Sequence, residues 1–308
     1  MDTLLYTHPA FLAHNTGSGH PESPERLKAV WNALSSPEFK ALKRREAPLG
    51  LIEQVRLVHN AEYVDAIMDA LPSHGLIQLD PDTILSPGSG EALLRGVGAT
   101  CAAVDAIMTG EAQNAFCAVR PCGHHAEPDR AMGFCIFNQI AIAAAHARAA
   151  HGLSRIAIVD FDVHHGNGTQ AAFLTNPAFF YTSTHQSPLY PGTGSRSEQG
   201  IGNIVNIPLP QGTGSAAFQQ AVESEMLPAL ETFKPDFILI SAGFDAFHGD
   251  PLAGLKLEAD DFYWITRKLM HLADKHCHGR IVSMLEGGYS ISGLEQGSAA
   301  HVRALLER

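Results

Sequence analysis

Residues 156–168 read Ile156-Ala-Ile-Val-Asp-Phe-Asp-Val-His-His-Gly-Asn-Gly168, an apolar run that ends in two carboxylates and two imidazoles. A continuous apolar run is typical of a strand that is buried on both faces, as strands are in a parallel sheet covered by helices. Ionisable groups directly after such a strand are costly inside a core unless they bind something. The stretch therefore predicts a parallel sheet with a functional site at the carboxyl end of this strand.

Similar apolar runs alternate with helical patterns along the rest of the chain. The expected strands are Leu4–His8, at an edge of the sheet, Ala115–Val119, Arg155–Asp160, Phe179–Thr184, Ile204–Ile207, Asp236–Ser241 and Arg280–Leu285. The expected helices are Pro24–Ala33, Ala61–Ala70, Ser89–Thr109, Phe137–Ala150, Ala216–Phe233, Ala259–Lys275 and Leu294–Leu306. This alternation predicts a doubly wound α/β fold with helices on both faces of a mostly parallel sheet. Because no linker interrupts the pattern, we expect residues 1–308 to form a single domain.

The composition restricts the partners and the compartment. The chain has 21 Lys and Arg against 32 Asp and Glu, a net charge of −11, which argues against a nucleic-acid partner or an anionic membrane surface. Its five cysteines are odd in number and lack CxxC spacing, so neither a disulfide framework nor a structural zinc knuckle is indicated. The sequence shows no signal peptide and no apolar run near the roughly 20 residues that span a bilayer. We expect a soluble cytoplasmic protein, and a homo-oligomer is compatible with the sequence.

Carboxylates and an imidazole at the ends of two predicted strands form a candidate metal site. Asp162 and His164 lie two residues apart and so project to the same side of an extended chain, as does Asp160. Asp245 follows a second apolar strand. Two carboxylates and one imidazole suit a divalent ion such as Zn²⁺ and leave a coordination position open for catalysis. The alternative for Asp160 or Asp162 taken alone is capping of the following helix.

Two further stretches add acid and base groups. Arg120-Pro-Cys-Gly-His-His-Ala-Glu127 places His124 and His125 directly after a strand, where tandem imidazoles indicate proton transfer. In Glu286-Gly-Gly-Tyr289 the glycines allow a sharp turn that presents a tyrosine hydroxyl, a suitable hydrogen-bond donor to an oxyanion. The alternative for Tyr289 is simple packing.

The motifs taken together resemble a known family of enzymes. They are RPCGHHAE at residues 120–127, GFCIFN at 133–138, VDFDVHHGNGTQ at 159–170, SAGFDAFHGDPL at 241–252 and LEGGY at 285–289. They are similar to the zinc-dependent histone deacetylases and acetylpolyamine amidohydrolases, with class II and bacterial-type members the nearer match. The resemblance runs from His20 to the last strand, and it implies an arginase/deacetylase-like fold.

The resemblance also implies roles for individual residues. The expected ligands of one catalytic Zn²⁺ are Asp162, His164 and Asp245. His125 is expected to act as general base and then general acid, while His124 orients it electrostatically. Asp160 is expected to hold the ring of His124, and Tyr289 to polarise the substrate carbonyl.

One catalytic position departs from class I members of this family. Asn167 stands where those enzymes carry a carboxylate beside the second histidine. An amide stabilises an imidazolium less well than a carboxylate does, so we predict a lower pKa for His125 here than in an Asn167→Asp variant.

The resemblance extends to substrate contacts and to a second cation. Gly133 and Phe134 resemble one wall of a narrow acyl-lysine tunnel, Tyr190 is placed as the facing aromatic, and Leu252 lies at the tunnel mouth. The alternative for Phe134 is ordinary core packing. The expected holders of a structural K⁺ are Asp160, Asp162, His164, Ser183 and Thr184, because carbonyl and hydroxyl oxygens suit a hard cation.

Three functions remain open at this stage. The first is hydrolysis of N-acyl-lysine, such as acetyl-lysine, in proteins or peptides. The second is hydrolysis of acylated polyamines, which a Glu at position 252 would favour; the residue there is Leu252, although an acidic residue from another loop or subunit can substitute. Asp82, in a stretch that resembles a rim loop of these enzymes, is a candidate contact for a substrate backbone or ammonium group, and the alternative is an ordinary turn. The third is a non-catalytic module that binds acylated amines, which has no need for an acid and base pair beside a metal. An arginase-like site with two metal ions would need more ligands than these loops offer.

Outside the motifs, four histidines are expected at the surface: His146, His151, His271 and His301.

Overall fold

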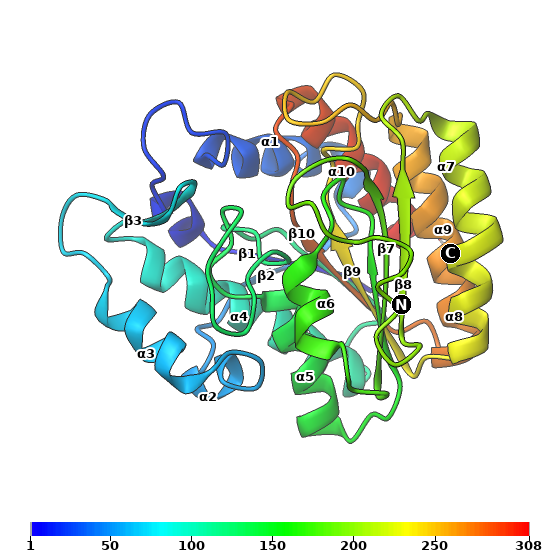
Figure 1. Ribbon diagram of the computed structural model, residues 1–308, viewed down its shortest axis with the longest axis horizontal. Coiled ribbons are helices and arrows are strands. Elements are labelled where there is room, and N and C mark those ends of the chain that lie inside the picture. Colours follow the sequence, from blue (N-terminus) through cyan, green and yellow to red (C-terminus); the bar gives the residue numbers. More distant parts are fainter. Residues whose placement is uncertain (1, 308) are drawn as a thin grey trace.

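The computed structural model describes residues 2–307 (Figure 1). Its strands are β1 Thr3–Thr7, β2 Lys43–Glu46, β3 Ile77–Asp80, β4 Thr83–Leu85, β5 Asn114–Cys117, β6 Ile156–Asp160, β7 Phe179–Gln186, β8 Ile204–Leu209, β9 Phe237–Ala242 and β10 Ile281–Leu285. Its α-helices are α1 Pro24–Leu34, α2 Ile52–Val55, α3 Ala61–Asp69, α4 Ser89–Met108, α5 Gln139–His151, α6 Asn167–Phe173, α7 Ser215–Ala221, α8 Leu227–Phe233, α9 Ala259–Cys277 and α10 Ile291–Leu306.

Eight of these strands form one sheet in the order β2-β1-β5-β10-β9-β6-β7-β8, and every neighbouring pair is parallel. The α/β prediction is therefore confirmed. β5, β6, β7, β9 and β10 are buried along their whole length, as the mainly apolar runs of β6, β9 and β10 predicted. β3 and β4 pair antiparallel in a small separate sheet.

The prediction of Leu4–His8 as an edge strand is wrong in its position. β1 lies inside the sheet, between β5 and β2, and β2 forms the edge. β2 has the sequence Lys-Arg-Arg-Glu and is exposed at all four residues, so its pattern lacks the apolar alternation that marks a strand. Charged side chains on an edge strand are a common protection against unwanted strand pairing.

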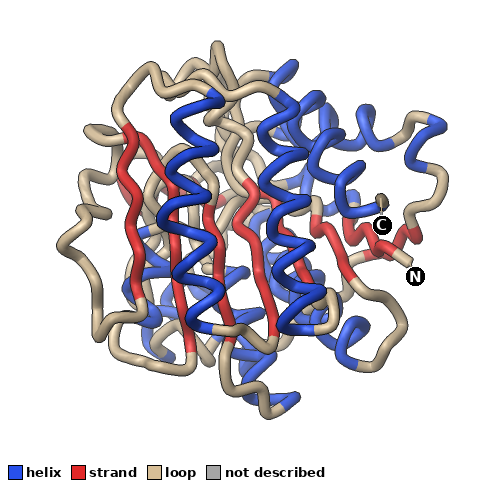
Figure 2. Tube along the Cα trace, turned by 90° about the vertical axis from the view of Figure 1, so that its right-hand side faces the viewer, coloured by secondary structure: helices blue, strands red, loops and turns tan. Residues whose placement is uncertain are grey.

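Helices cover both faces of the sheet (Figure 2). α4 and α5 pack together over β1, β5, β6, β9 and β10 on one face, while α9 and α10 pack together and contact β9 and β5 on the other. The helix expected at Ala216–Phe233 is divided into α7, a π-helical turn at Val222–Met226, and α8. Pro228 at the start of α8 has no backbone N–H to donate, which explains why regular α-helical bonding does not run through this point.

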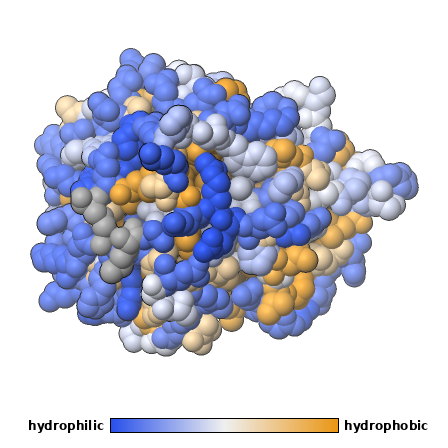
Figure 3. Space-filling view, turned by 180° about the vertical axis from the view of Figure 1, so that it is seen from behind, coloured by the Kyte–Doolittle hydropathy of each residue, from blue (hydrophilic) through white to orange (hydrophobic). Residues whose placement is uncertain are grey.

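One face of the molecule is mainly polar. Figure 3 shows hydrophilic residues over most of one face, with smaller apolar areas between them. Among residues 2–307, no helix combines the length and apolar character needed to cross a bilayer.

Candidate active site

Four central strands of the sheet, β5, β10, β9 and β6, carry the ionisable motifs at their carboxyl ends. The segment 120–127 follows β5, the segment 286–289 follows β10, and Asp245 follows β9. The segment 160–168 begins at the last residue of β6 and continues beyond it. Because parallel strands end at one edge of the sheet, these loops meet although they are up to 169 residues apart in sequence, as Arg120 and Tyr289 are. The site lies at this edge.

Asp162, His164 and Asp245 form a compact group of candidate metal ligands. All three are buried, and their ligand atoms lie within 4.8 Å of one another. Nδ1 of His164 is 3.1 Å from Oδ1 of Asp162 and 3.2 Å from Oδ2 of Asp245. The arrangement provides one nitrogen and two carboxylate oxygens facing a common point.

Backbone groups hold the far oxygen of each carboxylate. Gly287 N donates to Oδ2 of Asp162 at 2.7 Å, and Val163 N donates to Oδ1 of Asp245 at 2.9 Å. A Cβ atom on Gly287 would lie 2.0 Å from Oδ2 of Asp245, and a Cβ on Gly243 would lie 2.1 Å from Oδ2 of Asp162. Only glycine therefore fits at these two positions, and the backbone closes tightly around the carboxylates.

Two buried carboxylates so close together favour a bound cation. Burial, together with the charge of Asp162, raises the pKa of Asp245 to about 7. Burial alone would lower the pKa of His164, but hydrogen bonds to Asp162 and Asp245 raise it to about 10. The metal-free site thus holds protons that a divalent cation would replace, and its oxygen and nitrogen donors fit a borderline ion.

His124 and Asp160 form a buried pair beside this group. Nδ1 of His124 lies 3.0 Å from Oδ2 of Asp160, which also accepts from the hydroxyl of Tyr181 at 3.0 Å. Burial alone would lower the pKa of His124, but the charges of Asp162, Asp160 and Glu286 raise it well above its ordinary value. His124 is therefore held as an imidazolium.

His125 has a different partner and the opposite electrostatics. Its Nδ1 lies 2.8 Å from Oδ1 of Asn167, and Nδ2 of Asn167 donates to Oε1 of Glu127 at 2.8 Å. Because the Glu127 carboxylate accepts from the amide NH₂, the amide oxygen faces His125, whose Nδ1 must carry a proton. Burial and the positive charges of His124 and His164 lower the pKa of His125 well below its ordinary value. The neutral ring therefore keeps an unprotonated Nε2.

Tyr289 is held by its backbone and by its ring. Oδ2 of Asp250 accepts from the backbone N–H groups of Tyr289 at 2.8 Å and Ser290 at 3.1 Å. The guanidinium carbon of Arg26 lies 4.9 Å from the centre of the Tyr289 ring. Burial raises the pKa of Tyr289 well above its ordinary value, so the phenol stays protonated and can donate a hydrogen bond.

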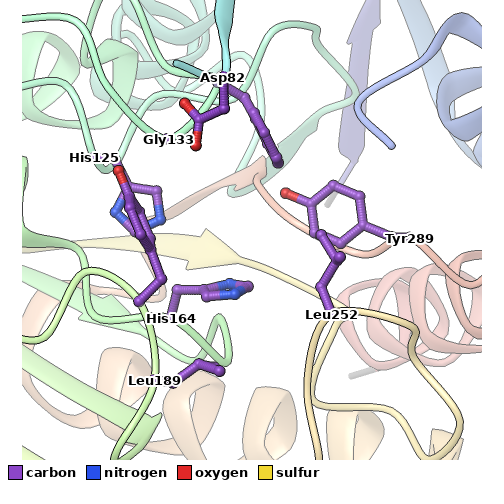
Figure 4. Close-up of a pocket in the computed structure, with 9 residues that line it drawn as sticks. Asp82, His125, Gly133, His164, Leu189, Leu252 and Tyr289 are labelled. Atoms are coloured by element: carbon purple, nitrogen blue, oxygen red, sulfur yellow. The ribbon is translucent and has the colours of Figure 1, made fainter. Parts of the chain in front are cut away.

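A pocket of about 230 Å³ opens onto these groups. It is lined by Asp82, His125, Gly133, Phe134, His164, Leu189, Tyr190, Leu252 and Tyr289. Figure 4 shows the hydroxyl of Tyr289 turned across the pocket toward His125, with His164 between them and Leu252 below Tyr289. The four residues expected at the substrate, Gly133, Phe134, Tyr190 and Leu252, thus all lie at one pocket together with His125 and Tyr289.

The glycine at position 133 brings the pocket wall against the second histidine. Gly133 has a φ of +57°, and a Cβ there would lie 2.6 Å from Cδ2 of His125 and 3.0 Å from a ring carbon of Tyr190. A side chain at this position would push both rings aside. Gly133 is therefore required for the wall itself, and Phe134 is placed at the pocket rather than in the core.

Comparison with known proteins assigns the family. The sequence matches the family described as the Histone deacetylase domain over residues 20–305. The chain belongs to the histone deacetylase family. Members of this family hydrolyse acylated amines, and the predicted relationship is confirmed.

Individual relatives agree with this assignment. The chain is 40% identical to Histone deacetylase 14, chloroplastic, of Arabidopsis thaliana over 98% of its own length and 76% of the relative's. It is 41% identical to the Histone deacetylase-like amidohydrolase of Pseudomonas aeruginosa over 89% of its own length and 73% of the relative's. The crystal structure of the HDA15 HD domain superposes with a TM-score of 0.91 at 33% identity, covering 98% of this chain and 88% of that one.

Several buried residues of this deacetylase-family site escape sequence reasoning. Oε2 of Glu286 accepts from the backbone of Gly123 at 2.7 Å and of His124 at 3.2 Å, which ties the tandem histidines to the tyrosine loop. Arg26 donates to the carbonyl oxygens of Glu286 and Gly288. Glu22 joins Arg26 to a second buried arginine, Arg120. Arg120 and Glu286 lie within the sequence motifs, and their charge was the available signal, because such groups are rarely buried unless paired.

Of the residues expected to hold potassium, Asp162 and His164 are also candidate metal ligands, and the other three lie at the adjacent ends of β6 and β7. Asp160 at the end of β6 pairs in register with Ser183 on β7, and Thr184 follows it. The side chain of Asp160 accepts from the backbone of Asp162 at 3.1 Å. The hydroxyl of Ser183 lies 2.9 Å from Nδ1 of His185.

One histidine expected at the surface is buried instead. His301 is 0% exposed, and its two nitrogens lie 2.7 Å from the hydroxyls of Thr266 and Ser283. The helical pattern around it did not reveal that α10 turns this residue toward the sheet. Cys122 is 1% exposed and contacts Cys135.

Proposed function

We propose that this chain is a zinc-dependent hydrolase of N-acyl-lysine side chains in proteins or peptides, with residues 1–308 acting as one catalytic domain. The observation that carries the proposal is the meeting of a candidate metal group, a neutral imidazole and a protonated phenol at one pocket with apolar walls. The reaction adds water across the amide, releasing a carboxylate and the free amine of lysine.

The donor set of Asp162, His164 and Asp245 fits Zn²⁺, which prefers a small number of nitrogen and oxygen ligands in catalytic sites. When bound there, zinc supplies a Lewis acid that polarises the substrate carbonyl and acidifies water. The chain's own contribution is to keep both carboxylates in place through Gly287 N and Val163 N. Rigid ligands preserve an open position for the substrate.

His125 is the proposed general base. Its Nε2 is free to take a proton from the attacking water, because Asn167 and Glu127 keep the ring proton on Nδ1. The same nitrogen then returns the proton to the departing amine. His124 is already protonated beside Asp160, so its proposed role is to stabilise negative charge that develops in the transition state.

Tyr289 is the proposed oxyanion donor. Its hydroxyl turns into the pocket, and its raised pKa keeps the proton available. Phe134, Tyr190 and Leu252 line the route to it and can bury the methylene groups of a lysine side chain, each worth about 0.8 kcal/mol. A neutral residue at position 252 favours acyl-lysine over a polycationic substrate.

Hydrolysis of acylated polyamines is the second candidate function, and one observation favours it. Asp82 lines the pocket, where its carboxylate can attract a distal ammonium group. The binding-module alternative explains neither the unprotonated Nε2 of His125 nor the protonated phenol of Tyr289 at the same pocket.

A substrate panel tests the proposal. Zinc-loaded enzyme should hydrolyse acetyl-lysine peptides with a higher kcat/KM than acetylpolyamines, and Asp82→Asn should change this preference little. If polyamines are preferred, and Asp82→Asn removes the preference, the second candidate replaces the first. A zinc-loaded enzyme that binds acyl-lysine peptides, but hydrolyses no acetylated or longer-acylated substrate, would establish a binding module instead.

The pH dependence of kcat/KM tests the role of His125. In Asn167→Asp a carboxylate beside Nδ1 should raise the pKa of His125. Because the base form is needed and is lost as pH falls through this pKa, the acid limb of the profile should move to higher pH. Glu127→Gln is the comparison variant, because it removes a negative charge near Asn167 and places no new charge beside the ring of His125. An unchanged acid limb in Asn167→Asp would assign the limb to another group.

We also propose that Asp160, Asp162, His164, Ser183 and Thr184 hold a structural K⁺ through carbonyl and hydroxyl oxygens. The adjacent ends of β6 and β7 support this proposal, because they bring the two groups of residues to one place.

A further inference from the structure

A second cluster of metal-ligating side chains lies away from the catalytic pocket. Asp105 lies in the last turn of α4, and His146 and His151 lie in the last turns of α5. α5 begins next to the GFCIFN motif at the catalytic edge and ends just before β6 begins. The cluster is therefore at the amino edge of the sheet, and the proposed catalytic reaction makes no use of it.

The three side chains converge on one point. Nε2 of His146 and Nε2 of His151 each lie 2.7 Å from the same oxygen, Oδ1 of Asp105. The two rings are 6.0 Å apart between centres and nearly perpendicular, at 86°. The side chains are 12%, 21% and 48% exposed for His146, His151 and Asp105, so the cluster is accessible from solvent yet partly enclosed.

We propose that Asp105, His146 and His151 form a second binding site, for a divalent cation of the zinc class. Two imidazole nitrogens and one carboxylate oxygen are a donor set that such ions prefer, and a fourth position is left for water. Ligands around a tetrahedral ion with bonds of about 2.0–2.1 Å lie roughly 3.3 Å apart. The 2.7 Å separations need to open only slightly, which partly exposed side chains can do without moving the helices.

The local charge supports a cation at this point. His151 is the last residue of α5, and Asp105 precedes the end of α4 by only three residues. The C-terminal end of a helix carries partial negative charge, which is favourable for a cation within the last turn. The two helix ends and the carboxylate of Asp105 thus all favour a cation at this point.

A bound ion would join α4 to α5. These two helices pack against each other over the same face of the sheet, and the cluster lies at their C-terminal ends. The cation would therefore stabilise the folded chain without contacting the substrate, because binding to the native state alone raises stability.

The test counts zinc ions on the tag-free chain of residues 1–308. Equilibrium dialysis against buffered Zn²⁺, followed by elemental analysis, should find one ion fewer on His146→Gln/His151→Gln than on the unmodified chain. His74→Gln, which changes an exposed loop histidine, is the matched control and should bind as many ions as the unmodified chain. Asp105→Asn repeats the test with a single change of similar size, should the double variant fail to fold.

Two further measurements separate this site from the catalytic one. Asp245→Asn should lose a different ion, so combining it with the double variant should remove both. Added Zn²⁺ should raise the melting temperature of the unmodified chain more than that of His146→Gln/His151→Gln, which should retain hydrolytic activity. Equal zinc content and equal melting shifts in the unmodified chain, the double variant and Asp105→Asn would show an ion-pair cluster only, whatever the outcome for Asp245→Asn.

Discussion

Asp245→Asn should abolish most hydrolysis while leaving the chain folded. The substitution removes one of three candidate ligands from a group that offers one nitrogen and two carboxylates. A catalytic metal contributes several kcal/mol of transition-state stabilisation, so kcat/KM should fall by roughly a thousandfold or more at limiting zinc. Zinc content and kcat/KM, measured on the same preparation, check this result.

The stability of the metal-free variant is a second readout. Burial and the charge of Asp162 raise the pKa of Asp245 to about 7. A raised carboxyl pKa means that the folded state loses stability as pH rises from the unfolded-state value toward 7, and this cost is complete above 7. Asn at this position carries no such cost, so metal-free Asp245→Asn should be at least as stable as the metal-free parent at pH 8.

Asp236→Asn is the matched control for this prediction. Asp236 precedes β9 and pairs with Arg155 at the partly exposed amino edge, whereas Asp245 follows the same strand at the catalytic edge. Loss of one such ion pair costs about 1 kcal/mol or less and should leave zinc content and kcat/KM unchanged. Full activity in Asp245→Asn at limiting zinc would overturn the assignment of the metal site.

Tyr289→Phe should lower kcat by about 100-fold to 1,000-fold, the usual effect of removing one donor to an oxyanion. The hydroxyl is turned into the pocket, while the ring is held by Arg26 and its backbone by Asp250. Phenylalanine keeps the ring in place and removes only the donor. KM and zinc content should therefore change little, because the lost interaction belongs to the transition state.

Tyr190→Phe is the control for the loss of a hydroxyl at the same pocket. Tyr190 also lines the pocket, and 40% of it is exposed. Its proposed contribution comes from the ring, which the variant retains, so kcat should stay near that of the parent enzyme. If Tyr289→Phe and Tyr190→Phe lower kcat equally, neither hydroxyl acts as the specific oxyanion donor.

Most of the strands that carry the site were predictable because they are mainly apolar runs that lead into ionisable residues. Ile156–Asp160 and Phe237–Ala242 show this most clearly, and both are buried throughout. By contrast, β2 consists of four exposed charged residues, and nothing in its own sequence distinguishes it from a loop. Its strand conformation depends on hydrogen bonding to β1.

Long-range partners of the site were not predictable in the same way. Asp250 holds the backbone of Tyr289, and Glu127 orients the amide of Asn167, through bonds that span 39 and 40 residues of sequence. A sequence shows that such groups are present, but a hydrogen bond requires distance and direction. Only the folded chain supplies these.

By itself, the sequence supplied the candidate ligand, acid and base residues and predicted the edge of the sheet at which they lie. Apolar strands must be buried, and the polar residues after them must therefore gather where parallel strands end. The tertiary structure alone decided that β10 and β9 insert between β5 and β6, which places the loops that carry Tyr289 and Asp245 between the loops that carry the tandem histidines and Asp162. The order of strands depends on how helices pack over both faces of the sheet, a non-local balance of burial that no single stretch of residues encodes.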